Sequence, residues 1–415
     1  MILSKKILLL GLTTIALNAT TLKEIINLTL ENNDNLKSNQ TLNLSKKRAY
    51  ESVQNTYNPT LNIGANVIRL DGDRRSVQVG TTATGFVKLG LDLYNGGKNQ
   101  ALKKQKKYEY KSAQLSATNS KKEIILQVVN LFYQIQTGIE NIKVLQEKSA
   151  TLKAQYERVK TKYDIKMTTK DEVLKLQSEY ESNEYSIEEL KYQKDMLLQN
   201  ISLLAGQEIT KLDRSVLPSI LKFDFQKSEN IKAIEYDIKA KEQNTKVIQS
   251  VNYPQIKLED SFNLYNYDDY DQNVLKDLPD QQNQLMVSIT YNLYDTGSKH
   301  KIESAKLVKI ASAQKLNYLK KQEKMVFDLA KKQLRTMKLK IKSQKSAVEM
   351  GDSVYDIVKV KYQNGIVDNI TYLDALSKKI YNQALYQKAL NDYEIAKANY
   401  YFSSGVDYRS ILDKF

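Results

Sequence analysis

The sequence of 415 residues contains no cysteine and a single histidine, His300. The lack of cysteine excludes disulfides, thiol nucleophiles, Cys/His zinc sites and lipid attachment through an N-terminal cysteine. His300 follows a predicted turn at residues 294–297 and is interpreted as a surface side chain. Phosphate-binding glycine loops and the HExxH and GxSxG motifs are also missing. The sequence therefore predicts no enzymatic activity, no metal and no cofactor.

Proline is scarce, with only four in the chain. Pro59 and Pro254 each open a stretch of alternating apolar and polar residues, and Pro218 lies between the two halves. Because proline breaks helices and strand ladders, the long stretches without it can form very long helices. A continuous helix over 98–163 would approach ~100 Å at ~1.5 Å per residue. Apolar residues spaced three and four apart along it predict a coiled coil that forms a rod or a tunnel wall.

Long apolar runs are missing except at the start of the chain. Lys5 and Lys6 precede an apolar run over 7–16, and Ala19 is a suitable cleavage residue, so residues 1–19 are expected to be a signal peptide. The remainder holds no stretch long enough for a transmembrane helix. A mature chain that spans a membrane would then need a β-barrel.

The net charge is +15, from 63 basic and 48 acidic residues. A positive balance can indicate binding to nucleic acid or to anionic lipid. The lysines are spread along predicted helices among polar residues, which favours solvated helix faces. We therefore expect no nucleic-acid partner.

The chain contains two similar halves. The expected organisation is a first repeat over 20–220 with a strand pair at about 59–95, and a second repeat over 221–415 with a strand pair at about 254–295 and a C-terminal tail. In each half a helix precedes the strand pair, and a long helix and a second helix follow it. The repeated turn after each strand pair contains Tyr94, Gly96 and Gly97 in the first half and Tyr294, Asp295 and Gly297 in the second.

Each predicted strand is about ten residues long, close to the ~9–11 residues that cross a bilayer in a tilted strand. Apolar residues alternate with polar ones, so one face could contact lipid and the other water, although Asp260 interrupts the apolar face. Four strands are too few to close a membrane barrel, which needs about eight, so the chain would have to oligomerise. The alternative is a pair of soluble hairpins on a helical body.

Together, the signal peptide, the two repeats, the strand pairs and the repeated Leu-Tyr-Asn/Asp-x-Gly turns resemble the TolC-type outer-membrane efflux proteins. The resemblance implies a mixed α/β membrane protein that is a homotrimer, with a shared twelve-stranded β-barrel in outer-membrane lipid and a coiled-coil tunnel in the periplasm of a Gram-negative bacterium. It also implies a passive exit duct for tripartite efflux or type I secretion, whose partners are a periplasmic adaptor (membrane fusion protein) and an inner-membrane pump. The competing interpretation is an exported coiled-coil structural or adaptor protein without a channel.

The same resemblance implies a gate at the periplasmic end of the tunnel. Tyr163 and Tyr362 fall at the turns between paired helices, and Thr371 and Asp374 fall in the segment that matches an acidic family motif of the form Asp-x-Leu-Asp-Ala. Asp374 matches the second acidic position, whereas Thr371 replaces the first. Glu172 matches an acidic partner of the tyrosine. Asp374 and Glu172 could equally be ordinary solvated acids.

Overall fold

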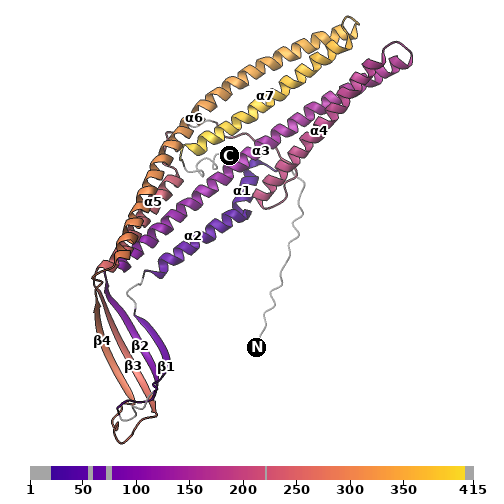
Figure 1. Ribbon diagram of the computed structural model, residues 1–415. Coiled ribbons are helices and arrows are strands. Elements are labelled where there is room, and N and C mark those ends of the chain that lie inside the picture. Colours follow the sequence, from indigo (N-terminus) through magenta and orange to yellow (C-terminus); the bar gives the residue numbers. More distant parts are fainter. Residues whose placement is uncertain (1–19, 55–58, 72–76, 220–221, 407–415) are drawn as a thin grey trace, which may run out of the picture. The chain divides into compact units, whose positions relative to one another are not determined.

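The computed structural model describes residues 20–54, 59–71, 77–219 and 222–406. The signal peptide expected at 1–19 lies outside the described residues. The described residues fall into two compact units, the first within 20–39, 118–219, 222–228 and 321–406 and the second within 40–54, 59–71, 77–117 and 229–320. Figure 1 shows the elements, whose bounds are α1 Leu22–Asn32, α2 Asp34–Ser52, β1 Thr60–Arg69, β2 Thr81–Asn95, α3 Lys98–Asp164, α4 Lys170–Ala205, α5 Glu229–Gln249, β3 Gln255–Asp268, β4 Gln281–Thr290, α6 Thr296–Gln363 and α7 Asn369–Ser403.

In the second unit, β1 to β4 form one antiparallel sheet in chain order (Figure 1). This confirms the four strands predicted from the period-two patterns. Strand β4 ends at Thr290, short of the predicted boundary near 295. The reason is that its neighbour β3 begins only at Gln255, which pairs with Thr290. Pro254 precedes it and has no N–H to extend the ladder.

The first strand pair leads into α3 through Gly96 and Gly97, whose φ angles are +63° and +77°. Glycine suits this left-handed region because it has no Cβ. At Gly96 a Cβ would also lie 2.4 Å from the carbonyl oxygen of Ser250. Asn95 Oδ1 accepts a hydrogen bond from the Asn99 N–H at 3.3 Å. The turn is therefore fixed by both its glycines and a side-chain cap.

The equivalent turn before α6 uses a carboxylate. Asp295 Oδ1 accepts the Ser298 N–H at 3.1 Å, and Asp295 Oδ2 accepts the Ser298 hydroxyl. These hydrogen bonds, chiefly the one from the side chain, hold the pKa of Asp295 below its usual range. Asn95 and Asp295 occupy the same position in the two repeats, and each accepts a backbone N–H at the start of the following long helix.

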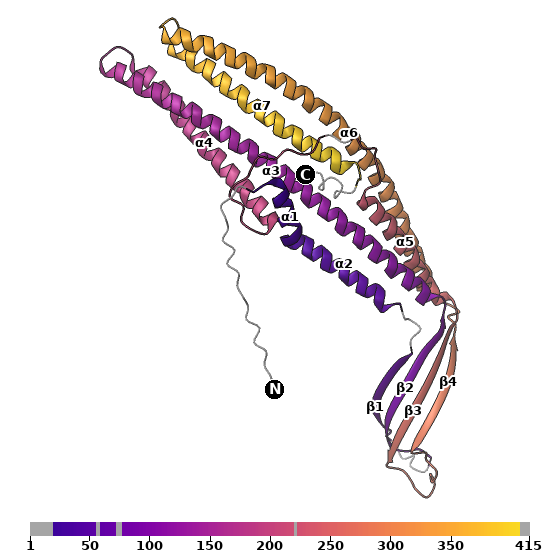
Figure 2. The same cartoon turned by 180° about the vertical axis from the view of Figure 1, so that it is seen from behind.

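Helices α3 and α6 have 67 and 68 residues, so each extends for ~100 Å along its axis. The expectation of very long helices is confirmed. In the first unit, Leu22 and Ile26 of α1 pack with Phe132 of α3 and Ile201 of α4 in a buried cluster. A capping box of Thr21 and Glu24 fixes the start of α1. Figure 2 shows the pairs α3/α4 and α6/α7, each joined by a tight turn.

Among the described residues, no helix is both long enough and apolar enough to cross a bilayer.

The segment between α4 and α5 is bound along α7. Glu394 Oε2 accepts the Leu217 N–H at 2.8 Å, and Lys397 Nζ donates to the Leu217 carbonyl at 3.0 Å. The Tyr401 hydroxyl lies 2.9 Å from the carbonyl oxygen of Ser219. These contacts satisfy backbone groups of a segment that has little secondary structure of its own.

Candidate functional site: the turns of the two helix pairs

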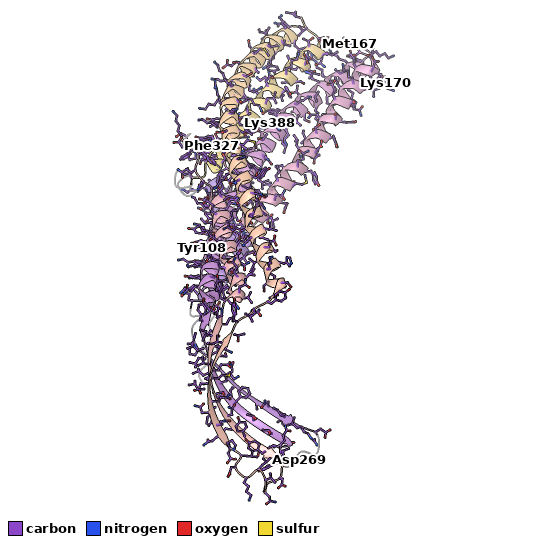
Figure 3. All side chains as sticks on the ribbon, turned by 60° about the vertical axis from the view of Figure 1, so that its left-hand side comes forward. Tyr108, Met167, Lys170, Asp269, Phe327 and Lys388 are labelled. Atoms are coloured by element: carbon purple, nitrogen blue, oxygen red, sulfur yellow. The ribbon has the colours of Figure 1, made fainter. Side chains whose placement is uncertain are left out.

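The first unit contains two helix–turn–helix ends, at 165–169 between α3 and α4 and at 364–368 between α6 and α7. Figure 3 labels Met167 and Lys170 at the first of them. In each turn an N–H returns to the carbonyl of the repeated tyrosine, from Lys166 to Tyr163 at 2.8 Å and from Gly365 to Tyr362 at 3.0 Å. Lys166 and Gly365 both have positive φ, of 60° and 73°. The two turns therefore have the same backbone form, a left-handed cap at the end of a helix.

The helices that follow the two turns, α4 and α7, differ in how their first turns are capped. Asp368 caps α7, because its Oδ1 accepts the Thr371 N–H at 2.8 Å, whereas Thr169 at the start of α4 makes no side-chain cap bond. Hydrogen bonding by Thr371 holds the pKa of Asp368 below its usual range. Thr371, proposed from the sequence as part of the gate, thus contributes its backbone to a helix cap.

Tyr362 connects the two helix pairs. Arg158 Nη1 on α3 donates to the Tyr362 hydroxyl at 2.8 Å, and that hydroxyl donates to Gln155 Oε1 at 3.2 Å. The guanidinium carbon of Arg158 also lies 5.4 Å from the centre of the Tyr362 ring. These contacts join residues about 200 positions apart in the sequence.

A tyrosine cluster supports this contact from the α7 side. The rings of Tyr362 and Tyr372 stack at 4.7 Å between centres and 17° between planes. The Tyr372 hydroxyl lies 3.2 Å from that of Tyr355. Burial, followed by this hydrogen bond, raises the pKa of Tyr372 to about 12. Tyr372 is therefore uncharged at neutral pH, and its stacked ring orients the Tyr362 ring.

Glu172 has a different partner from the one expected. It accepts a hydrogen bond from the hydroxyl of Thr168 on its own turn, while Tyr362 bonds to Arg158 and Gln155. Sequence reasoning missed both α3 residues. Gln155 and Arg158 are three residues apart, so they lie on one face of α3. No local sequence pattern indicates which tyrosine they contact.

A groove of about 770 Å³ lies between the two helix ends. It brings together three of the predicted gate residues, Glu172, Tyr362 and Asp374, but it is not lined by Thr371 or Tyr163. Asp374 is exposed and pairs with Lys378 at 2.8 Å. The charged groups that line the groove are balanced in sign: Lys148, Arg158, Lys162 and Lys175 against Glu172, Glu179, Asp368 and Asp374. The arrangement suits a reversible contact between helix pairs.

Residues 25–207 match a family model described as outer membrane efflux protein. The Campylobacter jejuni CmeC outer membrane channel is similar in structure, with a TM-score of 0.82 and 15% identity over 95% of this chain and 89% of that one. So is the outer membrane protein VceC of Vibrio cholerae, with a TM-score of 0.79 and 14% identity over 92% and 96% of the two chains. The open state of the Neisseria gonorrhoeae MtrE outer membrane channel gives 0.77 and 17% identity over 93% and 89%.

In a comparison with curated protein sequences, none matched. The family match confirms the resemblance to outer-membrane efflux proteins and the outer-membrane location predicted from the sequence. The solved structures, at these low identities, confirm the fold of helices and a four-stranded sheet over nearly the whole chain.

Proposed function

We propose that the protein is the passive outer-membrane duct of a tripartite efflux or type I secretion system. Three copies would each contribute β1 to β4 to a twelve-stranded barrel and their long helices to a periplasmic tunnel. Small molecules or a polypeptide would leave through it, driven by an inner-membrane pump and a periplasmic adaptor. The two repeats would supply equivalent helix pairs to the tunnel.

The observation that carries the proposal is a sheet that is incomplete in a single copy. Strands β1 and β4 each have one neighbour in the sheet, so each leaves an open edge. On one face, Ile63, Leu285 and Val287 are 85%, 69% and 60% exposed. Open edges and a broad exposed apolar face are unfavourable in water. Pairing with further copies and contact with lipid would satisfy both.

We further propose that the groove between the helix ends is the periplasmic gate. The contact of Arg158 and Gln155 with Tyr362 would hold the two helix pairs together in the closed state. Each such hydrogen bond contributes only about 0.5–1.5 kcal/mol, so a partner protein could break it. In a trimer, three Asp374 carboxylates would favour cations at the opening, although each is partly balanced by Lys378.

Single-channel recording in planar lipid bilayers tests this function. We expect small, cation-selective steps from the purified protein and larger steps from Tyr362→Phe, which keeps the stacked ring but removes the hydroxyl contacts. The variant Asp374→Asn should weaken cation preference without raising conductance. Stable trimers extracted from outer membranes should accompany the channel. If the protein is soluble without detergent and never conducts, even with the Tyr362 contact removed, the exported structural or adaptor alternative is favoured.

A further inference from the structure

The tyrosine cluster of Tyr355, Tyr362 and Tyr372 is built from alternating helices. Tyr355 and Tyr362 are seven residues apart on α6, and Tyr372 and Lys379 are seven apart on α7, so each pair lies on one face of its helix. The Tyr372 ring pairs with both α6 tyrosines, at 4.7 Å between ring centres for Tyr362 and 5.9 Å for Tyr355. The three rings are thus connected in one series, with Tyr372 as the middle member.

A cation lies at each end of this series. Lys379 Nζ lies 4.7 Å from the centre of the Tyr355 ring and 3.4 Å from Asp352 Oδ1. At the other end, the guanidinium carbon of Arg158 lies 5.4 Å from the centre of the Tyr362 ring. Each cation is attracted by the negative face of the ring beside it. The series therefore leads from the packing of α6 on α7 to the contact with α3.

The first half of the chain has the same turn but a valine in place of the middle ring. Tyr163 matches Tyr362, and the residues ten positions after them are Val173 and Tyr372. Valine has no ring to stack on a tyrosine. Tyr163 is 40% exposed, whereas Tyr362 is partly buried and its hydroxyl is hydrogen-bonded. The series is therefore a property of α6 and α7, and not of the turn that the two halves share.

We propose that Tyr355 and Tyr372 are positioning residues of the gate, and that Lys379 fixes the far end of their series. Without neighbours, the Tyr362 ring could rotate about its own side-chain bonds, and its hydroxyl would then leave Arg158. A ring stacked on it with 17° between planes restricts that rotation. Tyr372 is restricted in turn by its pair with the Tyr355 ring. Only the role of this contact in closing a channel rests on the proposed function.

Acetylation of tyrosine hydroxyls by N-acetylimidazole, mapped residue by residue with mass spectrometry on the purified full-length protein, tests this. The test variant is Tyr355→Leu, whose changed residue lies two turns, or about 10 Å along α6, from Tyr362. In the wild-type protein the hydroxyl of Tyr362 should react more slowly than that of Tyr163, its exposed equivalent. We expect Tyr355→Leu to speed acetylation of Tyr362 about fivefold and to leave Tyr163 unchanged.

Two control variants separate positioning from general packing. Tyr355→Phe keeps the ring and should recover most of the wild-type protection of Tyr362. Tyr180→Leu removes a partly buried tyrosine of α4 that packs against the same hydrophobic cluster as Tyr372, and it should leave the rate at Tyr362 unchanged. Equal acceleration in Tyr180→Leu would assign the effect to lost packing and overturn the proposal. An unchanged rate in Tyr355→Leu, a Phe variant as reactive as the Leu variant, or a wild-type Tyr362 as reactive as Tyr163 would overturn it as well.

Acetylation requires no ion current, so the result holds even if the purified protein never conducts, which would count against the duct alone. In a conducting channel, Tyr355→Leu should raise the conductance but add nothing to Tyr362→Phe, because both changes act through the same hydroxyl. A further increase in the double variant would show that Tyr355 acts elsewhere and would reject its positioning role.

Discussion

Replacing Lys397 with methionine should release residues 206–219 from helix α7. Lys397 Nζ lies 2.7 Å from Glu394 Oε2, and the two side chains are only 5% and 11% exposed. Glu394 also accepts the Leu217 N–H, so the carboxylate cannot simply turn to solvent. The substitution would leave a negative charge buried beside the backbone without its cation.

Removing one partner of a buried ion pair costs about 3–5 kcal/mol. If the segment opens locally, the lower value already raises its open population by about a hundredfold, at 1.4 kcal/mol per factor of ten. Limited trypsin digestion in detergent measures this opening, because Lys211 and Arg214 lie in the segment. With opening fast relative to cleavage, the cleavage rate follows the open population. We therefore expect cleavage after Lys211 and Arg214 to be about a hundred times faster, as mapped by mass spectrometry.

The matched control combines Lys397→Met with Glu394→Gln. Glutamine keeps a carbonyl oxygen for the Leu217 N–H and carries no charge, so the double variant loses chiefly one hydrogen bond, worth about 1 kcal/mol. Its cleavage rate should return to within about tenfold of the wild type. If the single and double variants are cleaved equally fast, the unpaired buried charge is not the cause and the reasoning fails.

Two further predictions concern the turns. Gly96→Ala should destabilise the protein by about 1–3 kcal/mol more than Gly97→Ala, because a Cβ would clash at Gly96 but meets open space at Gly97. Thermal melting midpoints of the two variants measure this difference, and equal midpoints would contradict it. The folded-state pKa of Asp368 is depressed, so its cap stabilises α7 above the usual carboxyl range and this support is lost as the pH falls below about 4. Hydrogen exchange at Thr371 should therefore differ between wild type and Asp368→Ala at pH 7, and the difference should shrink as the pH falls below the usual carboxyl range.

Much of the fold could be predicted because it depends on local patterns. Alternation with a period of two located the four strands, and the scarcity of proline allowed helices of 67 and 68 residues. The end of β4 could not be placed in this way. The alternating residues continue through Tyr291 and Leu293, but a strand also needs a hydrogen-bonded neighbour, and β3 begins opposite Thr290.

In the candidate site, too, local patterns predict the turns but not the contacts between distant helices. The tyrosine turns were visible in the sequence because each turn forms within a few residues, and the structure gives Tyr163 and Tyr362 the same backbone role. The partner of the Tyr362 hydroxyl depends on how two helix pairs pack, so a single local motif does not determine it. Arg158, on α3, supplies the donor that holds the Tyr362 hydroxyl. If Arg158 performs that role, its replacement by glutamine should open the channel as Tyr362→Phe does, and the double variant should open it no further, because both changes remove the same hydrogen bond.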